Sequence, residues 1–203
     1  KTGGTTRGRK VMGFIRNLLA AIGVVALIGA AVVGAKVRPF FTEFDPGAYA
    51  TYKTMAVKLL ETGSPAQATV WKTEVAEGLS FEDVDESIQS IAIENNIKDV
   101  GALPLGRQIE AMTGGKWRQV KIYLYCNPLT AAKMMDFDDA FSAYLPCRVT
   151  LVEDKTGKLW LYSLDMDMMI HGGKPLPEDV RAEAIEVKRI IQDVMKRGAE
   201  GDF

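Results

Sequence analysis

The feature that most constrains this chain is a run of 19 residues, 17–35, that contains no ionisable side chain. In a helix that rises about 1.5 Å per residue, this run nearly spans the roughly 30 Å hydrocarbon core of a bilayer. A basic segment rich in Gly and Thr precedes the run, whereas a buried core helix would be flanked by amphipathic elements. We therefore expect a basic tail over residues 1–16 and a transmembrane helix over residues 17–38.

A cleaved signal peptide is the main alternative to a retained anchor. The segment has a basic start and an apolar centre, and Val33 and Ala35 are suitably placed for cleavage after Ala35. The apolar run is, however, longer than the roughly 7–15 residues usual for a signal peptide. We interpret the segment as a retained single-pass anchor.

The distribution of charge predicts the orientation of this anchor. Five basic residues and no acidic residue precede it, whereas only Lys36 and Arg38 separate it from the first acidic residues, Glu43 and Asp45. The positive-inside rule then places the N-terminus in the cytoplasm. We expect the protein in the inner (cytoplasmic) membrane of a bacterium, with its domain in the periplasm. The five basic residues are Lys1, Arg7, Arg9, Lys10 and Arg16.

Small residues form a stripe along the predicted anchor. Ala26, Ala30 and Gly34 recur every four residues, and Gly23 lies one turn earlier. Small residues at this spacing let a second helix approach closely in lipid, although Ala and Gly are also common in membrane helices in general. The stripe predicts contacts with transmembrane partner subunits as well as with membrane lipid.

Composition excludes several classes of function for the remaining roughly 160 residues, which suffice for one domain. The net charge is −1 and no basic cluster lies outside the N-terminal tail, so nucleic acid is not an expected partner. Two cysteines and one histidine are too few for a Cys/His zinc site, and C-x-x-C-H and G-x-S-x-G are absent from the sequence. We assign no catalytic residue, no metal ligand and no cofactor.

Periodicity predicts an α+β domain with a mainly antiparallel sheet covered by helices. A connecting helix over residues 39–66 starts at Asp45-Pro46, the domain covers residues 67–175, and an amphipathic helix occupies residues 176–203. Ser80 and Asp83 form a capping-box pattern, and Asn127 precedes a helical proline. The expected strands cover residues 69–75, 97–103, 117–126, 147–153 and 158–164, in the order β-α-β-α-β-α-β-β-α.

Three motifs between residues 69 and 172 resemble the family known as domain of unknown function 302. They are IYLYCNP at 122–128, YLPCRVTLVED at 144–154 and GKLWLYSL at 157–164. The resemblance covers about half of the chain and leaves out the anchor and the C-terminal helix. It implies a compact α+β fold and often a homodimer, and it brings no established reaction.

Cys126 and Cys147 are the first candidates for chemistry. They end and begin two predicted strands, so antiparallel pairing would bring their sulfurs close together. They could be buried thiols, a disulfide, or a redox, persulfide or metal site. A helix N-terminus after Cys126 and Arg148 beside Cys147 would lower a thiol pKa and raise reactivity.

Two further segments offer weaker sites. Met166-Asp167-Met168-Met169-Ile170-His171 combines thioethers with an imidazole, which suits copper(I) or axial haem ligation, although methionines usually fill core gaps. Three carboxylates could hold a hard cation, but capping of the next helix is the simpler expectation. These carboxylates are Asp136, Asp138 and Asp139.

The sequence thus predicts a non-catalytic accessory or interaction subunit of a larger membrane complex. The first alternative is a thiol- or sulfur-handling redox protein that uses Cys126 and Cys147. The second is haem or copper binding at Met166–His171.

Overall fold

The computed structural model describes residues 5–202, with side chains from Met12 onward, and it divides into two compact units, Lys1–Phe44 and Asp45–Phe203. Residues 1–4 of the predicted basic tail, including Lys1, lie outside the described residues, as do the side chains of Arg7, Arg9 and Lys10. Each unit is described by itself.

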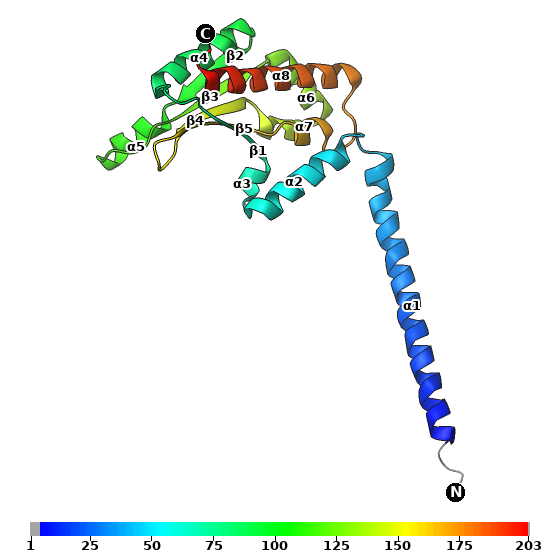
Figure 1. The fold of residues 1–203 in the computed structure, drawn as a ribbon. Helices are drawn as coiled ribbons and strands as arrows, with labels where there is room; N and C mark the ends of the chain where they lie inside the picture. The colour runs from blue at the N-terminus through cyan, green and yellow to red at the C-terminus, as the bar shows by residue number, and fades with distance from the viewer. Residues whose placement is uncertain (1–4, 203) are drawn as a thin grey trace. The chain divides into compact units, whose positions relative to one another are not determined.

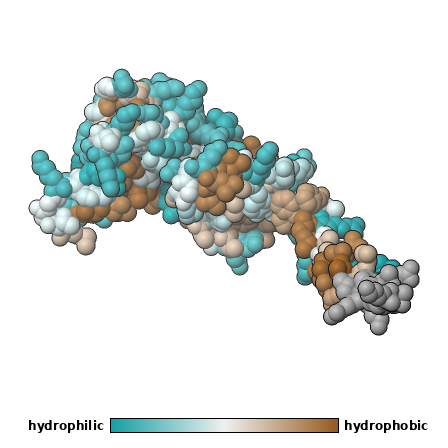
Figure 2. Space-filling model, turned by 60° about the horizontal axis from the view of Figure 1, so that its bottom comes forward, coloured by the Kyte–Doolittle hydropathy of each residue, from teal (hydrophilic) through white to brown (hydrophobic). Residues whose placement is uncertain are grey.

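The first unit is one long helix, α1 (Thr5–Thr42), which is longer than the 17–38 expected from the sequence. Its part from Met12 to Thr42 is long and apolar enough to cross a membrane, and no side chain in its most apolar stretch is buried. Hydrophobic residues cover much of its surface in Figure 2. By length and composition this helix is consistent with a membrane anchor or a signal sequence.

The second unit is built on a five-stranded sheet in the order β1-β5-β4-β3-β2, with every neighbouring pair antiparallel. The α+β class and the predicted element order are confirmed, because each predicted strand is present within a few residues. The strands are β1 (Val70–Glu74), β2 (Lys98–Leu103), β3 (Val120–Cys126), β4 (Cys147–Glu153) and β5 (Leu159–Leu164).

Helices account for most of the remaining second unit (Figure 1). They are α2 (Ala48–Thr62), α3 (Pro65–Ala68), α4 (Phe81–Glu94), α5 (Leu105–Thr113), α6 (Pro128–Phe137), the 3₁₀ helix η1 (Asp139–Tyr144), α7 (Asp167–His171) and α8 (Glu178–Glu200). The capping box of Ser80 and Asp83 and the cap formed by Asn127 are confirmed. The short helix α7 is not among the elements expected from the sequence.

The core lies between one face of the sheet and the helices α4 and α8, which run side by side across it (Figure 1). Alternate residues of the central strands, such as Val149 and Leu151, are fully buried against Ile88 of α4 and Ile191 of α8. The C-terminal helix, which the sequence analysis treats as a separate segment, therefore belongs to the core of this unit.

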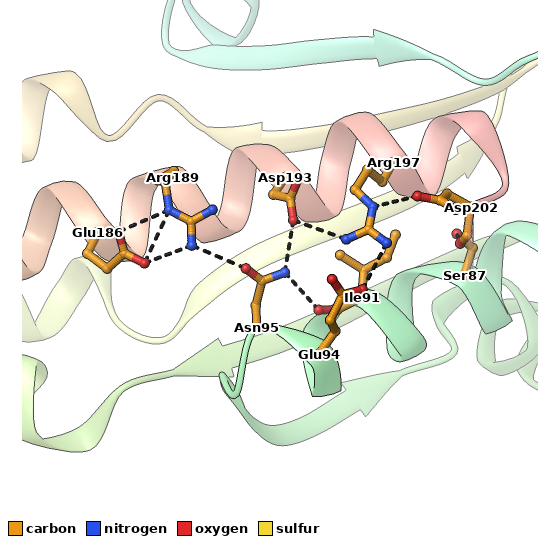
Figure 3. Close-up of polar contacts among 9 residues, drawn as sticks. All are labelled: Ser87, Ile91, Glu94, Asn95, Glu186, Arg189, Asp193, Arg197 and Asp202. Atoms are coloured by element: carbon orange, nitrogen blue, oxygen red, sulfur yellow. Dashed lines mark hydrogen bonds and ion pairs between the residues drawn. The ribbon is translucent and has the colours of Figure 1, made fainter.

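A polar network joins the outer sides of α4 and α8 (Figure 3). The guanidinium of Arg197 lies 2.8 Å from Glu94 Oε2 and 3.5 Å from Asp193 Oδ2, and its Nε donates to Asp202. Asn95 of the α4 C-terminus donates to Asp193 at 2.9 Å. These contacts fix the angle between the two helices and tie the end of the chain to α4.

The start of α2 differs from the expectation that Asp45 and Pro46 would open the helix. The helix begins at Ala48 with Gly47 in the cap position, while Asp45 turns its carboxylate inward and accepts a 2.7 Å hydrogen bond from the Gly47 N–H. The assigned helix thus starts a few residues later than expected, although Asp45 still accepts a hydrogen bond from the N–H two residues on, as a capping residue does, and it also binds His171, a partner distant in sequence.

Candidate functional site

A pocket of about 500 Å³ lies where α2, the α6–η1 segment, α7 and the loop before α8 meet. This volume is within the usual range for small-molecule sites. Its wall is mainly aromatic and thioether, with a few polar groups at its edge. The lining residues are Tyr52, Phe137, Asp138, Ala140, Phe141, Tyr144, Met168, Met169, Gly173, Lys174 and Leu176. We call it the large pocket, in contrast to the small cavities beside it, although the polar cleft between α4, α5 and β3 has a greater volume of about 690 Å³.

An aromatic row forms one wall of the large pocket. The ring centroids of Phe137 and Phe141 are 6.2 Å apart, and those of Phe141 and Tyr144 are 6.3 Å apart. These residues were not predicted from the sequence, because Asp138 is extended and separates Phe137 in α6 from Phe141 and Tyr144 in η1, so no single helical pattern connects them. On the α2 side, the Tyr52 hydroxyl donates to the Gly172 carbonyl at 2.7 Å and ties α2 to the end of α7.

The Met166–His171 segment is divided between the core and the pockets. Met166 and Ile170 are buried, whereas Met168 and Met169 line the large pocket. His171 does not line that pocket, because its Nδ1 lies 3.0 Å from the carboxylate of Asp45. The imidazole therefore contacts a carboxylate, whereas Met168 and Met169 face the pocket.

Asp45 is the centre of a buried polar cluster that joins the start of α2 to α7 and α8. Its Oδ1 lies 3.0 Å from His171 Nδ1, and its Oδ2 lies 3.5 Å from Arg181 Nη1. Burial by itself raises the pKa of Asp45, but the hydrogen bond from Gly47 and the contacts with His171 and Arg181 outweigh it and lower the pKa. The cluster therefore holds an ionised carboxylate in the interior.

Replacement of Asp45 by asparagine is expected to lower the free energy of unfolding by about 1–3 kcal/mol at pH 7, because the variant leaves His171 and Arg181 without their anion. Folding lowers the carboxyl pKa below its ordinary value of 3.8, so this stabilisation is present above about pH 4 and is lost as the pH falls through the folded pKa. Urea unfolding of both proteins at pH 7 and pH 3 measures the difference, with exposed Asp136→Asn as control. A gap of equal size at both pH values would contradict this account.

Cys126 and Cys147 lie at adjacent ends of β3 and β4, as expected. In the antiparallel register Cys147 pairs with Tyr125, so Cys126 is one residue beyond the pair. Both thiols are free, Cys147 is buried, and both line one small cavity beside α6 and α8.

The expected lowering of the thiol pKa values is wrong. Burial raises the pKa of Cys147 to about 11, and the neighbouring Cys126 adds to this effect, while the opposing influence of Arg148 is smaller. Burial also raises the pKa of Cys126. Both thiols are therefore protonated at neutral pH, which disfavours nucleophilic chemistry by the free side chains.

One of the three aspartates, Asp138, caps the next helix, as the simpler expectation predicted. The carboxylate of Asp138 caps η1 by accepting a 2.9 Å hydrogen bond from the Ala140 N–H, and Asp136 and Asp139 are exposed. Among the residues whose side chains are described, no three His, Cys, Asp or Glu side chains gather closely enough to hold a metal ion.

A second cleft, of about 690 Å³, lies between α4, α5 and β3 and has a strongly polar wall. At its base Asp85 accepts hydrogen bonds from Lys121 Nζ at 2.6 Å and from the buried Tyr123 hydroxyl at 2.8 Å. Burial, together with this hydrogen bond, raises the pKa of Tyr123. Lys121 and Tyr123 of β3 both donate hydrogen bonds to Asp85 of α4, so the three side chains cross-link α4 to the sheet.

Comparison with known families identifies the family to which this domain belongs. The family described as "Domain of unknown function DUF302" matches residues 71–198, more than half of the chain. The chain belongs to the DUF302 family. The match extends beyond the 69–172 expected from the motifs, and the expectation that the C-terminal helix lies outside the family is wrong. The reason is physical, because α8 supplies one side of the core.

A solved structure has the same fold as this DUF302 domain. The crystal structure of an uncharacterized conserved DUF302 protein from Bacillus stearothermophilus superposes with a TM-score of 0.51 and 12% sequence identity. The alignment covers 64% of this chain and 97% of that one. The family match at residues 71–198 does not include α1. A search of curated proteins finds no match.

Proposed function

We propose that this protein is a non-catalytic accessory subunit of a larger membrane complex, which presents its DUF302 domain at the membrane surface. The observation that carries the proposal is helix α1. Its apolar part, Met12–Thr42, exposes its side chains along its whole length and is attached to a domain with a complete core of its own. A helix of this kind is stable when lipid or a partner covers it.

The stripe of small residues supports helix–helix contact rather than simple tethering. A Cβ atom built at Gly23 or Gly34 would meet no atom within 4 Å, as is also the case at Gly13 and Gly29, so the stripe is open like the rest of the described helix. Ala26 and Ala30 continue the same side at helical spacing. The charge asymmetry around the span supports a cytoplasmic N-terminus and a periplasmic domain in a bacterial inner membrane.

The chemistry of the cysteines makes the thiol-redox alternative the weaker of the two. A redox or persulfide-carrying thiol needs thiolate character and access, whereas burial raises the pKa of both Cys126 and Cys147. His171 is engaged with Asp45 and does not line the pocket that Met168 and Met169 line, which likewise weakens a haem or copper site made from the segment Met166–His171.

Purification in a mild detergent tests the proposal. We expect the chain to elute together with other membrane subunits, which mass spectrometry identifies. We also expect the measured mass of the purified chain to correspond to a protein that keeps the small-residue stripe, whereas cleavage after Ala35 would remove the stripe. Ala30→Leu should reduce the recovered partner, because the larger side chain keeps the helices apart.

Ala21→Leu is the matched control, since nine residues at about 100° each place Ala21 on the opposite side of the helix. Equal loss of partner in both variants would contradict docking through the stripe. A chain that runs as a lone monomer in every mild detergent would remove the accessory-subunit proposal, and a dimer of this chain alone would identify a second copy as the partner.

A further inference from the structure

The small cavity that contains both cysteines has a wall rich in sulfur. Five of its eleven lining side chains carry sulfur, and its volume of about 20 Å³ leaves room for one body the size of a water molecule. The five are Cys126, Met134, Cys147, Met166 and Met169. They come from β3, α6, β4 and the segment around α7, so only the folded domain brings them together. We call this space the sulfur cavity.

The polar groups in the wall of the sulfur cavity already have partners. The Asn127 side-chain oxygen accepts hydrogen bonds from the Leu129 and Thr130 N–H groups, and the Thr130 hydroxyl donates to Glu183 at 3.0 Å. No carboxylate and no imidazole lines the cavity. The donor atoms that remain are two thiol and three thioether sulfurs.

The sulfur cavity shares wall residues with two neighbouring spaces. Met169 lines both the sulfur cavity and the large pocket, and Met168 lies beside it in the wall of the large pocket. Cys147, Met166 and Met169 also line a second small cavity of about 10 Å³. Three of the sulfur-bearing side chains therefore border more than one internal space.

We infer that the sulfur cavity is a binding site for a single copper(I) ion, with Cys126, Cys147, Met166 and Met169 as the candidate ligands. The chemistry of the donor set carries the choice of metal. Thiolate and thioether sulfur select soft Cu(I), whereas Mg²⁺ and Ca²⁺ require oxygen ligands and structural Zn²⁺ takes four Cys or His ligands. The size of the cavity matches one ion rather than a cluster or an organic cofactor.

Binding is coupled to proton release. A thiol that binds Cu(I) forms an S–Cu bond and gives up its proton to solvent, and the oxidation state of copper and sulfur does not change.

The test is an anaerobic titration of the full-length protein in detergent with Cu(I), in competition with a chromogenic Cu(I) chelator. We expect one Cu(I) per chain, an ultraviolet sulfur-to-copper charge-transfer band, and sulfur-only ligation by X-ray absorption. Cys126→Ser and Met169→Leu should each weaken binding by at least about tenfold. Failure of the parent protein to retain copper against the chelator would overturn the inference.

Matched variants separate ligand loss from unfolding. Met169→Leu nearly conserves volume and should leave the thermal unfolding midpoint almost unchanged. Met112→Leu makes the same replacement at an exposed residue outside the cavity and should leave Cu(I) affinity at the parent value. If Met169→Leu and Cys126→Ser, both folded, bind copper as tightly as Met112→Leu, the sulfur cavity is not the site.

Discussion

Removal of residues 1–44 is expected to move the protein completely from the membrane fraction to the soluble fraction. The deletion takes away the exposed apolar surface of α1, where each Leu, Ile or Val favours the bilayer by about 0.3–0.6 kcal/mol. All buried hydrophobic residues of the domain lie between Ala48 and Ala199, beyond the deleted segment, so the truncated domain should keep its fold. Flotation with liposomes and thermal unfolding of the two purified proteins measure these effects.

A shorter deletion is the control for this experiment. Loss of residues 1–11 removes basic residues but leaves the apolar part of α1, Met12–Thr42, in place, so this variant should still float with the liposomes. If the domain 45–203 itself floats, or if it is unfolded in solution, the assignment of membrane affinity to α1 is wrong.

Replacement of Leu151 by alanine is expected to lower the free energy of unfolding by about 2–5 kcal/mol. Leu151 is fully buried in β4, the middle strand of the sheet. Because β5 and β3 pair with β4 on its two sides, the structure cannot easily collapse into the cavity that the mutation leaves. Urea unfolding followed by circular dichroism gives the difference directly.

Leu129 offers a matched control, because the same substitution is made at a side chain that is 77% exposed. Leu129→Ala should change the free energy of unfolding by no more than about 0.5 kcal/mol. Similar losses in the two variants would show that the effect comes from leucine itself rather than from its burial in the core.

Elements with local signals were predictable from the sequence. The capping box joins residues three apart in the sequence. The Asn127 side chain caps α6 by accepting hydrogen bonds from the N–H groups of Leu129 and Thr130, and Gly157 adopts a positive φ in the β4–β5 turn. Such interactions depend only on nearby residues, so a linear pattern contains them. The five strands followed for the same reason, from short alternating or β-branched runs.

The candidate site was only partly predictable because its contacts are distant in sequence. The carboxylate of Asp45, which accepts a hydrogen bond from Gly47 before α2, also meets His171 across 126 positions, and no local pattern predicts that second contact. Helix α7 has five residues and no side-chain cap, so it leaves no recognisable pattern. The sequence analysis paired the methionines with His171, whereas the fold brings Met166 and Met169 to Cys126 and Cys147.

The two thiols illustrate how burial overrides neighbouring charge. The sequence places Arg148 next to Cys147, and from this alone a lowered pKa is a reasonable expectation. The strand alternation sends Cys147 to the core face and leaves Arg148 exposed, so desolvation dominates and the pKa rises to about 11. Which effect prevails depends on which face of the sheet each side chain occupies.

By itself the sequence determined the apolar helix, the α+β class and the family, because hydropathy, periodicity and helix capping depend on residues that are close together in the chain. Only the tertiary structure decided that α8 completes the core, that an ionised Asp45 is buried, and that sulfur atoms from four segments surround one cavity. These features arise when packing brings distant residues together and removes them from water, and no local pattern records the partners that each residue acquires.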